Sequence, residues 1–130
     1  MRHTGSGCTR LRWVWLLLVG SCAGCSCEQH LTVTATAFNS TRAQTDGDPY
    51  DTACGVKLQP GERMLAVSRD LAEQGLGCGA EITIDGIEGT WTVVDVTSAR
   101  HQRLIDLYMG RDVRGARQWG RREVDIHYCE

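Results

Sequence analysis

Alternating apolar and polar residues predict β-strands along most of the chain after residue 30. Residues 31–38 (Leu-Thr-Val-Thr-Ala-Thr-Ala-Phe) alternate and are rich in β-branched side chains, which favour strands. Similar short segments predict five further strands, at residues 64–68, 81–84, 90–96, 104–108 and 123–128. The turn signal Asp85-Gly86 predicts a hairpin between the third and fourth of the six. The pattern therefore indicates a mainly β fold.

Helical and irregular segments separate these strands. Residues 69–75 predict either a turn of helix or an irregular segment. Residues 111–119 predict a short helix that ends at Gly120, a residue that often follows a helix C-terminus. Residues 39–55 predict a long loop dense in Asp, Thr, Gly and Pro, and long ordered loops in small domains often shape binding sites. A chain of 130 residues supports one such domain.

The first thirty residues differ from the rest. Basic residues precede the apolar run 13–19, and small residues and cysteines follow, which is the layout of a secretory signal peptide. A permanent transmembrane helix needs about 20 apolar residues, so this run is too short to be one. We therefore expect residues 1–24 to be a signal peptide and residues 31–129 to form the exported domain.

Two cysteines near the end of this leader are candidate lipid anchors. Val-Gly-Ser-Cys22 resembles the box in which a bacterial lipoprotein is cleaved before its lipidated cysteine, and Cys25 is a second candidate. Cleavage by ordinary signal peptidase also fits residues 21–23. Lipidation of Cys22 would leave an odd number of cysteines in the mature chain, whereas lipidation of Cys25 would leave an even number. A lipid would tether the domain to a membrane surface.

Within the domain, Cys54 and Cys78 are the first candidates for a disulfide. Both lie in glycine-containing, loop-like sequence, and a bridge between them would stabilise a small exported core by about 3 kcal/mol. Sequence alone leaves the connectivity open. Cys22, Cys25 and Cys27 adjoin the leader and lack a matching downstream ligand set, so we predict neither a metal site nor a cofactor.

The charge balance limits the partners. Fourteen basic and sixteen acidic residues give a formal net charge of -2, whereas nucleic-acid-binding domains normally carry a strong basic excess. We therefore expect no nucleic-acid partner, and we expect a monomer.

Two aspartates in apolar surroundings are the leading candidates for chemistry. Asp95 lies in Val-Val-Asp-Val and Asp106 in Leu-Ile-Asp-Leu-Tyr, eleven positions later. A carboxylate among residues that favour burial is costly unless it is hydrogen-bonded, partnered or used. The spacing fits two strands that bring both carboxylates to one rim of a sheet or barrel. Structural aspartates that cap turns remain the alternative interpretation.

Several short segments, in this order, give the chain a resemblance to the three-aspartate (3D) domain family. They are residues 34–38, 44–49, 52–55, 65–68, 94–95 and 103–108. The match runs from about residue 32 to 128. The family is similar to the catalytic core of membrane-bound lytic transglycosylase A and is related to rare lipoprotein A, expansins and some endoglucanases. The resemblance implies a six-stranded double-psi β-barrel with one or two short helices.

The resemblance also implies a reaction and a set of site residues. The reaction is cleavage of the β-1,4 bond between N-acetylmuramic acid and N-acetylglucosamine in peptidoglycan, with formation of a 1,6-anhydro ring. Asp95 matches the catalytic aspartate, and Asp106 matches the aspartate of the next strand. Asp95 would act as acid and then base, which requires a pKa above the ordinary value of about 3.9. The remaining substrate-binding candidates are Gln44, Thr45, Asp46, Thr52 and Arg103.

The chain departs from the family at two places. Ser68 stands where the third aspartate is expected, with Asp70 two residues later, and residues 96–99 replace the usual glycines after the catalytic aspartate. His101, between the two aspartates, is either a proton carrier or an exposed loop histidine. Two alternatives to catalysis stay open: a non-catalytic peptidoglycan-binding or structural envelope lipoprotein, and a small accessory or inhibitor lipoprotein. Either way, we expect a location in the bacterial cell envelope, on the periplasmic face of the outer membrane if the chain is lipidated.

Overall fold

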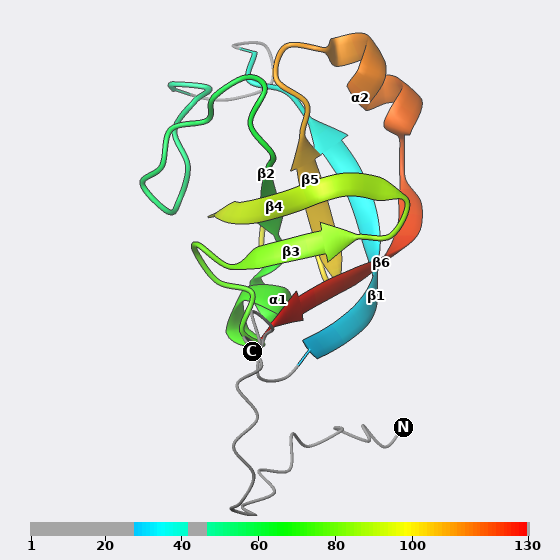
Figure 1. Cartoon of the computed structure of the whole chain (residues 1–130). Helices are drawn as coiled ribbons and strands as arrows, with labels where there is room; N and C mark the ends of the chain where they lie inside the picture. Colours follow the sequence, from blue (N-terminus) through cyan, green and yellow to red (C-terminus); the bar gives the residue numbers. More distant parts are fainter. Residues whose placement is uncertain (1–27, 42–46, 130) are drawn as a thin grey trace, which may run out of the picture.

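The computed structural model describes residues 28–41 and 47–129 (Figure 1). These residues form six strands and two short helices. In chain order they are β1 (Glu28–Phe38), β2 (Met64–Val67), α1 (Arg69–Glu73), β3 (Glu81–Ile84), β4 (Ile87–Val96), β5 (Leu104–Tyr108), α2 (Val113–Trp119) and β6 (Arg122–Cys129). All six predicted strands and the predicted short helix are confirmed, with ends that shift by up to three residues, and the segment after β2 is helical rather than irregular.

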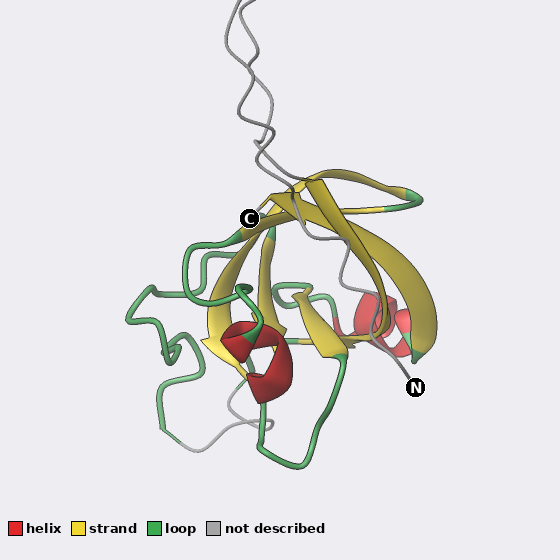
Figure 2. Ribbon diagram, turned by 90° about the horizontal axis from the view of Figure 1, so that it is seen from below, coloured by secondary structure: helices red, strands yellow, loops and turns green. Residues whose placement is uncertain are grey.

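The strands close into a barrel in the order β1-β5-β2-β4-β3-β6. Two pairings are parallel, β1 with β5 and β2 with β4, and the others are antiparallel. Figure 2 shows the strands curving around a common axis. The predicted hairpin of β3 and β4 is present. Strands β4 and β5, although consecutive, are not neighbours, because β2 lies between them.

Alternation along the strands fills the barrel. Each strand sends every second side chain inward, so the apolar positions meet in one core. This core comprises Val33, Ala35, Leu65, Val67, Leu71, Leu76, Ile82, Ile84, Trp91, Val93, Ile105, Leu107 and Ile126. A second, smaller cluster lies on the outer face beneath the long loop and contains Leu58, Val94 and Tyr108, packed by Phe38, Tyr50 and Met64.

The chain segments that enter α1 and β5 are joined at one corner of the barrel. Ser68 is fully buried, its N–H donates to the carbonyl of Leu104 over 2.8 Å, and its hydroxyl accepts the N–H of Leu104 over 3.0 Å. Beside it, the carboxylate of Asp70 accepts the N–H of Arg103 over 3.0 Å. Arg103 has a φ of 47°, an uncommon conformation for a residue with a side chain. Ser68 and Asp70 therefore hold the start of β5 in place.

Helix α2 begins two residues later than the sequence pattern predicts. Asp112 is its N-cap, because the carboxylate accepts the N–H of Gly115 over 2.8 Å and satisfies a free donor of the first turn. The helix ends at Gly120, as predicted, where a φ of 65° suits a residue without a side chain. In the described part of the chain, no helix is long and apolar enough to cross a membrane.

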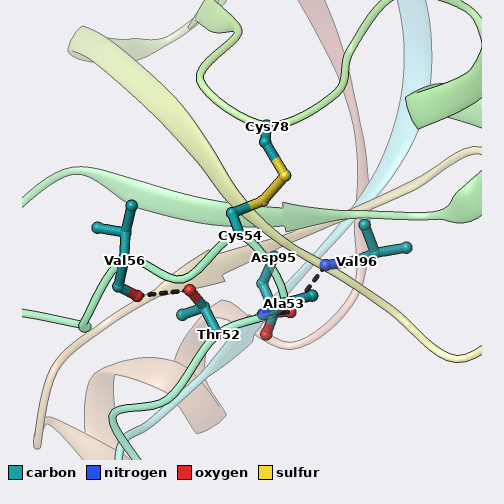
Figure 3. Close-up of a disulfide and its surroundings, with 7 residues drawn as sticks. All are labelled: Thr52, Ala53, Cys54, Val56, Cys78, Asp95 and Val96. Atoms are coloured by element: carbon teal, nitrogen blue, oxygen red, sulfur yellow. Dashed lines mark hydrogen bonds between the residues drawn. A yellow bond between two sulfur atoms is a disulfide. The ribbon is translucent and has the colours of Figure 1, made fainter.

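The predicted disulfide between Cys54 and Cys78 is present, and Figure 3 shows it attaching the long loop to the segment before β3. Cys129 is also disulfide-bonded. Disulfides persist in oxidising compartments, so their presence indicates an exported protein.

Candidate functional site

Strand register brings the two candidate aspartates onto one face of the sheet. Ala66 of β2 pairs with Asp106 on one side and with Asp95 on the other, and Thr36 of β1 pairs with Asp106. Paired residues of adjacent strands point to the same face, and adjacent strands lie about 4.8 Å apart, so the two aspartates are separated by about 10 Å of sheet. The small side chain of Ala66 leaves the space between them open.

A bulge in β4 is what turns Asp95 to this face. The pairing of β2 with β4 runs from Leu65–Val93 to Ala66–Asp95, so Val94 is an extra residue on the β4 side. A β-bulge interrupts strict alternation. Val93 therefore points into the barrel core, while Val94 belongs to the outer cluster and Asp95 lines the outer cavity.

The aspartates line a cavity of about 270 Å³ on this outer face. Its walls come from four strands and from the loop between β4 and β5. The lining residues are Phe38, Asn39, Ala66, Asp95, Val96, Thr97, Ser98, His101 and Asp106. One part of the wall is apolar and the other carries carboxyl, hydroxyl and imidazole groups.

Asp106 is half-buried, and its surroundings change its pKa. Burial raises its pKa, because a charged carboxylate loses hydration in the cavity. A hydrogen bond of 2.8 Å from the Thr36 hydroxyl acts in the opposite direction, as does His101, whereas the negative charge of Asp95 adds to the increase. The net result is a carboxyl group that keeps its proton to higher pH than an ordinary aspartate.

Asp95 is oriented by the backbone. Its Oδ1 atom accepts the N–H groups of Ala53 and Val96, each over 2.9 Å. Figure 3 shows both bonds beside the disulfide of Cys54, the residue that follows Ala53. The long loop is thus attached to β4 by the Ala53 bond and to the segment before β3 by the disulfide, and both hydrogen bonds of Asp95 use the same oxygen. Within the described residues, Oδ2 of Asp95 accepts no hydrogen bond.

Two further polar side chains in the wall have unsatisfied atoms. The Thr97 hydroxyl and the His101 Nδ1 are buried and have no hydrogen-bond partner within the described residues. The sequence left two interpretations of His101 open, a proton carrier or an exposed loop histidine. In the structure it is half-buried and lines the cavity. Its position between the two aspartates was the available signal. Thr36, Phe38 and Thr97 carried no comparable signal, because only strand register and the loop bring them to the site.

The other predicted binding residues lie elsewhere or outside the described residues. The Thr52 hydroxyl donates to the Val56 carbonyl within its own loop (Figure 3). Arg103 lines a separate hollow with Thr32 and Glu123, and its guanidinium donates to the Thr32 carbonyl over 3.1 Å. Residues outside the described part of the chain are Cys22, Gln44, Thr45 and Asp46.

Asp70 does not take the place of a third aspartate in the cavity. It lies at the corner that holds β5, away from the cavity lining. Within residues 28–41 and 47–129, no group of three or more His, Cys, Asp or Glu side chains is placed to hold a metal ion. The cavity lining offers carboxyl, hydroxyl and imidazole groups.

Comparison with known proteins extends the description of the fold. No protein-family model and no curated protein matches the sequence. Among solved structures, the chain is similar to the apo form of the expansin from Clavibacter michiganensis, with a TM-score of 0.50 and 19% identity over 75% of this chain and 49% of the expansin. A mutant of that expansin in complex with cellohexaose matches with a TM-score of 0.46 and 18% identity, over 77% of this chain and 49% of that one.

The Streptomyces papain inhibitor is similar over nearly its whole length. The TM-score is 0.52 and the identity 15%, over 78% of this chain and 96% of the inhibitor. By contrast, this chain spans about half the length of the expansin. Likeness at these identities shows a shared fold. The protein is thus a closed six-stranded barrel of the expansin type, as the resemblance to double-psi β-barrels predicted.

Proposed function

We propose that this protein is an exported cell-envelope enzyme that cleaves peptidoglycan strands as a lytic transglycosylase. The observation that carries the proposal is the half-buried carboxyl group of Asp106, whose pKa is raised by burial and which lines a cavity together with a second carboxyl group. Enzymes that protonate a glycosidic oxygen need a carboxylic acid of this kind near neutral pH. The resemblance to three-aspartate domains supplies the substrate class.

The composition of the cavity suits a sugar. Saccharide rings have apolar C–H faces and a rim of hydroxyl groups. Phe38, Ala66 and Val96 offer an apolar wall, and the carboxyl groups of Asp95 and Asp106 offer hydrogen-bonding partners.

In this mechanism Asp106 is the acid and then the base. Protonated Asp106 gives its proton to the bridging oxygen, and the bond from that oxygen to C1 of N-acetylmuramic acid breaks. The carboxylate then accepts the proton of the same sugar's 6-hydroxyl, whose oxygen closes the 1,6-anhydro ring. Water is not the nucleophile, so no second carboxylate is required to activate it.

Asp95 has the supporting role in this assignment. Its Oδ2 atom, which faces no recorded donor among the described residues, would stabilise positive charge that develops at C1. Its negative charge also helps Asp106 to keep its proton. The family resemblance alone assigned the acid to Asp95 and the partner to Asp106. The burial of Asp106 is the reason for exchanging the two roles.

The lipid anchor, the long loop and Arg103 would have supporting roles in this function. A lipid on Cys22 or Cys25 would hold the domain at a membrane surface next to the cell wall. Gln44, Thr45, Asp46 and Thr52 belong to the long loop in the sequence and would extend contact along the glycan. Arg103 would contact a peptide-stem carboxylate only outside the cavity, in its own hollow.

Digestion of purified sacculi tests the proposal. The wild-type protein should release muropeptides that end in 1,6-anhydro-N-acetylmuramic acid, detected by mass spectrometry. Asp106→Asn should lose this activity, and Asp95→Asn should weaken it. Glu88→Gln is the matched control, since Glu88 is an exposed acid on the same strand as Asp95 and should retain full activity. Anhydro products from Asp106→Asn at the wild-type rate would refute the assignment.

A non-catalytic peptidoglycan-binding module is the second candidate. The position of Asp70 favours it, because that residue holds the start of β5 and leaves the cavity with two aspartates. In this case the protein would sediment with sacculi and release no product. Both variants of the cavity aspartates would then alter binding alone.

A further inference from the structure

We propose that Thr97 and His101 form a subsite that binds the hydroxyl and acetamido groups of one sugar residue beside the two aspartates. The inference rests on the proposed function to the extent that it takes the cavity to be a glycan site. It assigns the hydroxyl and imidazole groups of the cavity to substrate recognition and names the two atoms that make the contacts.

Unsatisfied atoms gather in this cavity. Buried polar atoms in native proteins almost always have a hydrogen-bond partner, so each exception needs an explanation. In the described residues three buried side-chain atoms have none: Nε1 of Trp91, Oγ1 of Thr97 and Nδ1 of His101. Two of the three line the same cavity as Asp95 and Asp106. Both atoms are enclosed in the structure, so a ligand in the cavity would supply their missing partners once a rotation about one side-chain torsion turns each atom toward the cavity.

The backbone that carries these two side chains is held in place. The N–H of Thr97 donates to the carbonyl of Val67 over 2.8 Å, which extends the contact between β2 and β4 beyond the end of β4. The N–H of His101 donates to the carbonyl of Ser98 over 3.0 Å and closes a turn. The loop is therefore fixed through its main chain, and only the two side chains have to turn for a ligand to reach the enclosed atoms. Such preorganisation lowers the entropic cost of binding a ligand.

The chemistry of the two atoms selects the kind of ligand. A threonine hydroxyl both donates and accepts, and a histidine Nδ1 does either according to its tautomer. The same cavity holds the carboxyl groups of Asp95 and Asp106, and a carboxylate would repel an anion placed in the same space. A neutral group that both donates and accepts fits this set of side chains, and sugar hydroxyl and acetamido groups have this property.

Three substitutions separate recognition from folding. Thr97→Val keeps the shape of the side chain and removes a hydroxyl without a partner, so the protein should be at least as stable as the wild type. His101→Leu removes the ring nitrogens, and His101→Asn returns a polar atom close to the position of Nδ1. Trp91→Phe is the matched control, because it removes an unsatisfied N–H that does not line the cavity.

The measurement is calorimetric titration with a soluble tetrasaccharide of alternating N-acetylglucosamine and N-acetylmuramic acid. All proteins carry Asp106→Asn so that the ligand stays intact. We expect Thr97→Val and His101→Leu each to weaken binding about tenfold, the value of one net hydrogen bond. His101→Asn should recover most of that loss, and Trp91→Phe should bind as well as its parent. Chemical denaturation of the same proteins should show no loss of stability for Thr97→Val.

Other outcomes are equally decisive. Unchanged affinity in both Thr97→Val and His101→Leu overturns the subsite, as does a parent protein that does not bind the tetrasaccharide. If Thr97→Val weakens binding while Asp106→Asn still cleaves sacculi, the subsite stands and the acid role of Asp106 fails. If binding depends on Thr97 and no variant or wild type releases product, the subsite stands in a non-catalytic module.

Discussion

Two regions, one at the start of β5 and one in its middle, each contain a half-buried aspartate, and they shift its pKa in opposite directions. At the start of β5, partial burial acts to raise the pKa of Asp70, but hydrogen bonds from the Ser68 hydroxyl and the Arg103 N–H outweigh it and lower that pKa. In the middle of β5, burial dominates and raises the pKa of Asp106, although the Thr36 hydroxyl partly offsets it. One carboxyl group is stabilised as an anion and the other is not.

The difference lies in the donors that each carboxyl group receives. Backbone N–H donors and hydroxyl groups favour the charged form, and enclosure without enough donors favours the neutral form. Asp70 therefore contributes to the stability of the fold, whereas Asp106 is held in a state that costs stability at neutral pH. Groups held at such a cost are typical of functional sites.

The largest effect expected from this comparison is on catalysis. Asp106→Asn should reduce the rate of anhydro-muropeptide release by about 10² to 10⁴, the usual contribution of a general acid. Asp70→Asn should leave the rate per folded molecule unchanged, since Asp70 does not line the cavity. Both rates are measured by sacculus digestion and normalised to the amount of folded protein, which circular dichroism gives. Equal losses in the two variants would remove the distinction between the regions.

The disulfide offers the next largest effect. Replacing Cys54 and Cys78 together with serine should lower the free energy of unfolding by about 3 kcal/mol, because the bridge closes a long loop in the unfolded chain. It should also loosen the contact of Ala53 with Asp95, while the Asp70 corner stays intact. Denaturant unfolding measures the first effect, and the NMR shifts of the Ala53 and Arg103 amides report on the second. A larger disturbance at Arg103 than at Ala53 would contradict the account.

Asp70→Asn should destabilise the fold by about 1 kcal/mol at pH 7, a modest value because the carboxylate is partly open to solvent. Since folding lowers the pKa of Asp70, its contribution is complete above the unfolded pKa of about 3.9 and is lost as pH falls through the folded pKa. Urea unfolding of wild type and variant at several pH values should show the two curves converge in acid. A stability difference between wild type and variant that grows as pH falls would contradict a lowered pKa for Asp70.

Asp106→Asn should have the smallest effect on stability and the reverse sign. Folding raises the pKa of Asp106, so its carboxyl group costs least below the unfolded pKa, and the cost appears as pH rises through the folded pKa. The amide can still accept from Thr36 and carries no charge. The variant should therefore be more stable than the wild type at pH 7 and no more stable near pH 3. A less stable variant at pH 7 would indicate that Asp106 has a structural role.

Much of the fold follows from local patterns in the sequence. Alternation in residues 31–38 and 123–128 identified strands β1 and β6, the Asp85-Gly86 turn identified the β3–β4 hairpin, and loop-like flanks identified the Cys54–Cys78 pair. These features depend on neighbouring residues, or on cysteines that have few partners to choose from. The local sequence pattern was therefore sufficient to predict these strands, the hairpin and the disulfide.

The site depended on contacts that local pattern does not encode. Strict alternation from Val93 would direct Asp95 into the barrel, and only the bulge at Val94 turns it outward. The insertion of β2 between β4 and β5 sets the spacing of the aspartates, and Thr36 arrives from β1 through parallel pairing. Pairing between distant strands decides all three positions.

Titration of the aspartate carboxyl carbons by NMR tests the central claim most directly. In protein labelled with ¹³C, the Asp106 resonance should titrate above the ordinary aspartate range and the Asp70 resonance below it. Thr36→Val should move the Asp106 midpoint higher still, because it removes the opposing hydrogen bond. An Asp106 midpoint at or below that of Asp70 would contradict the account.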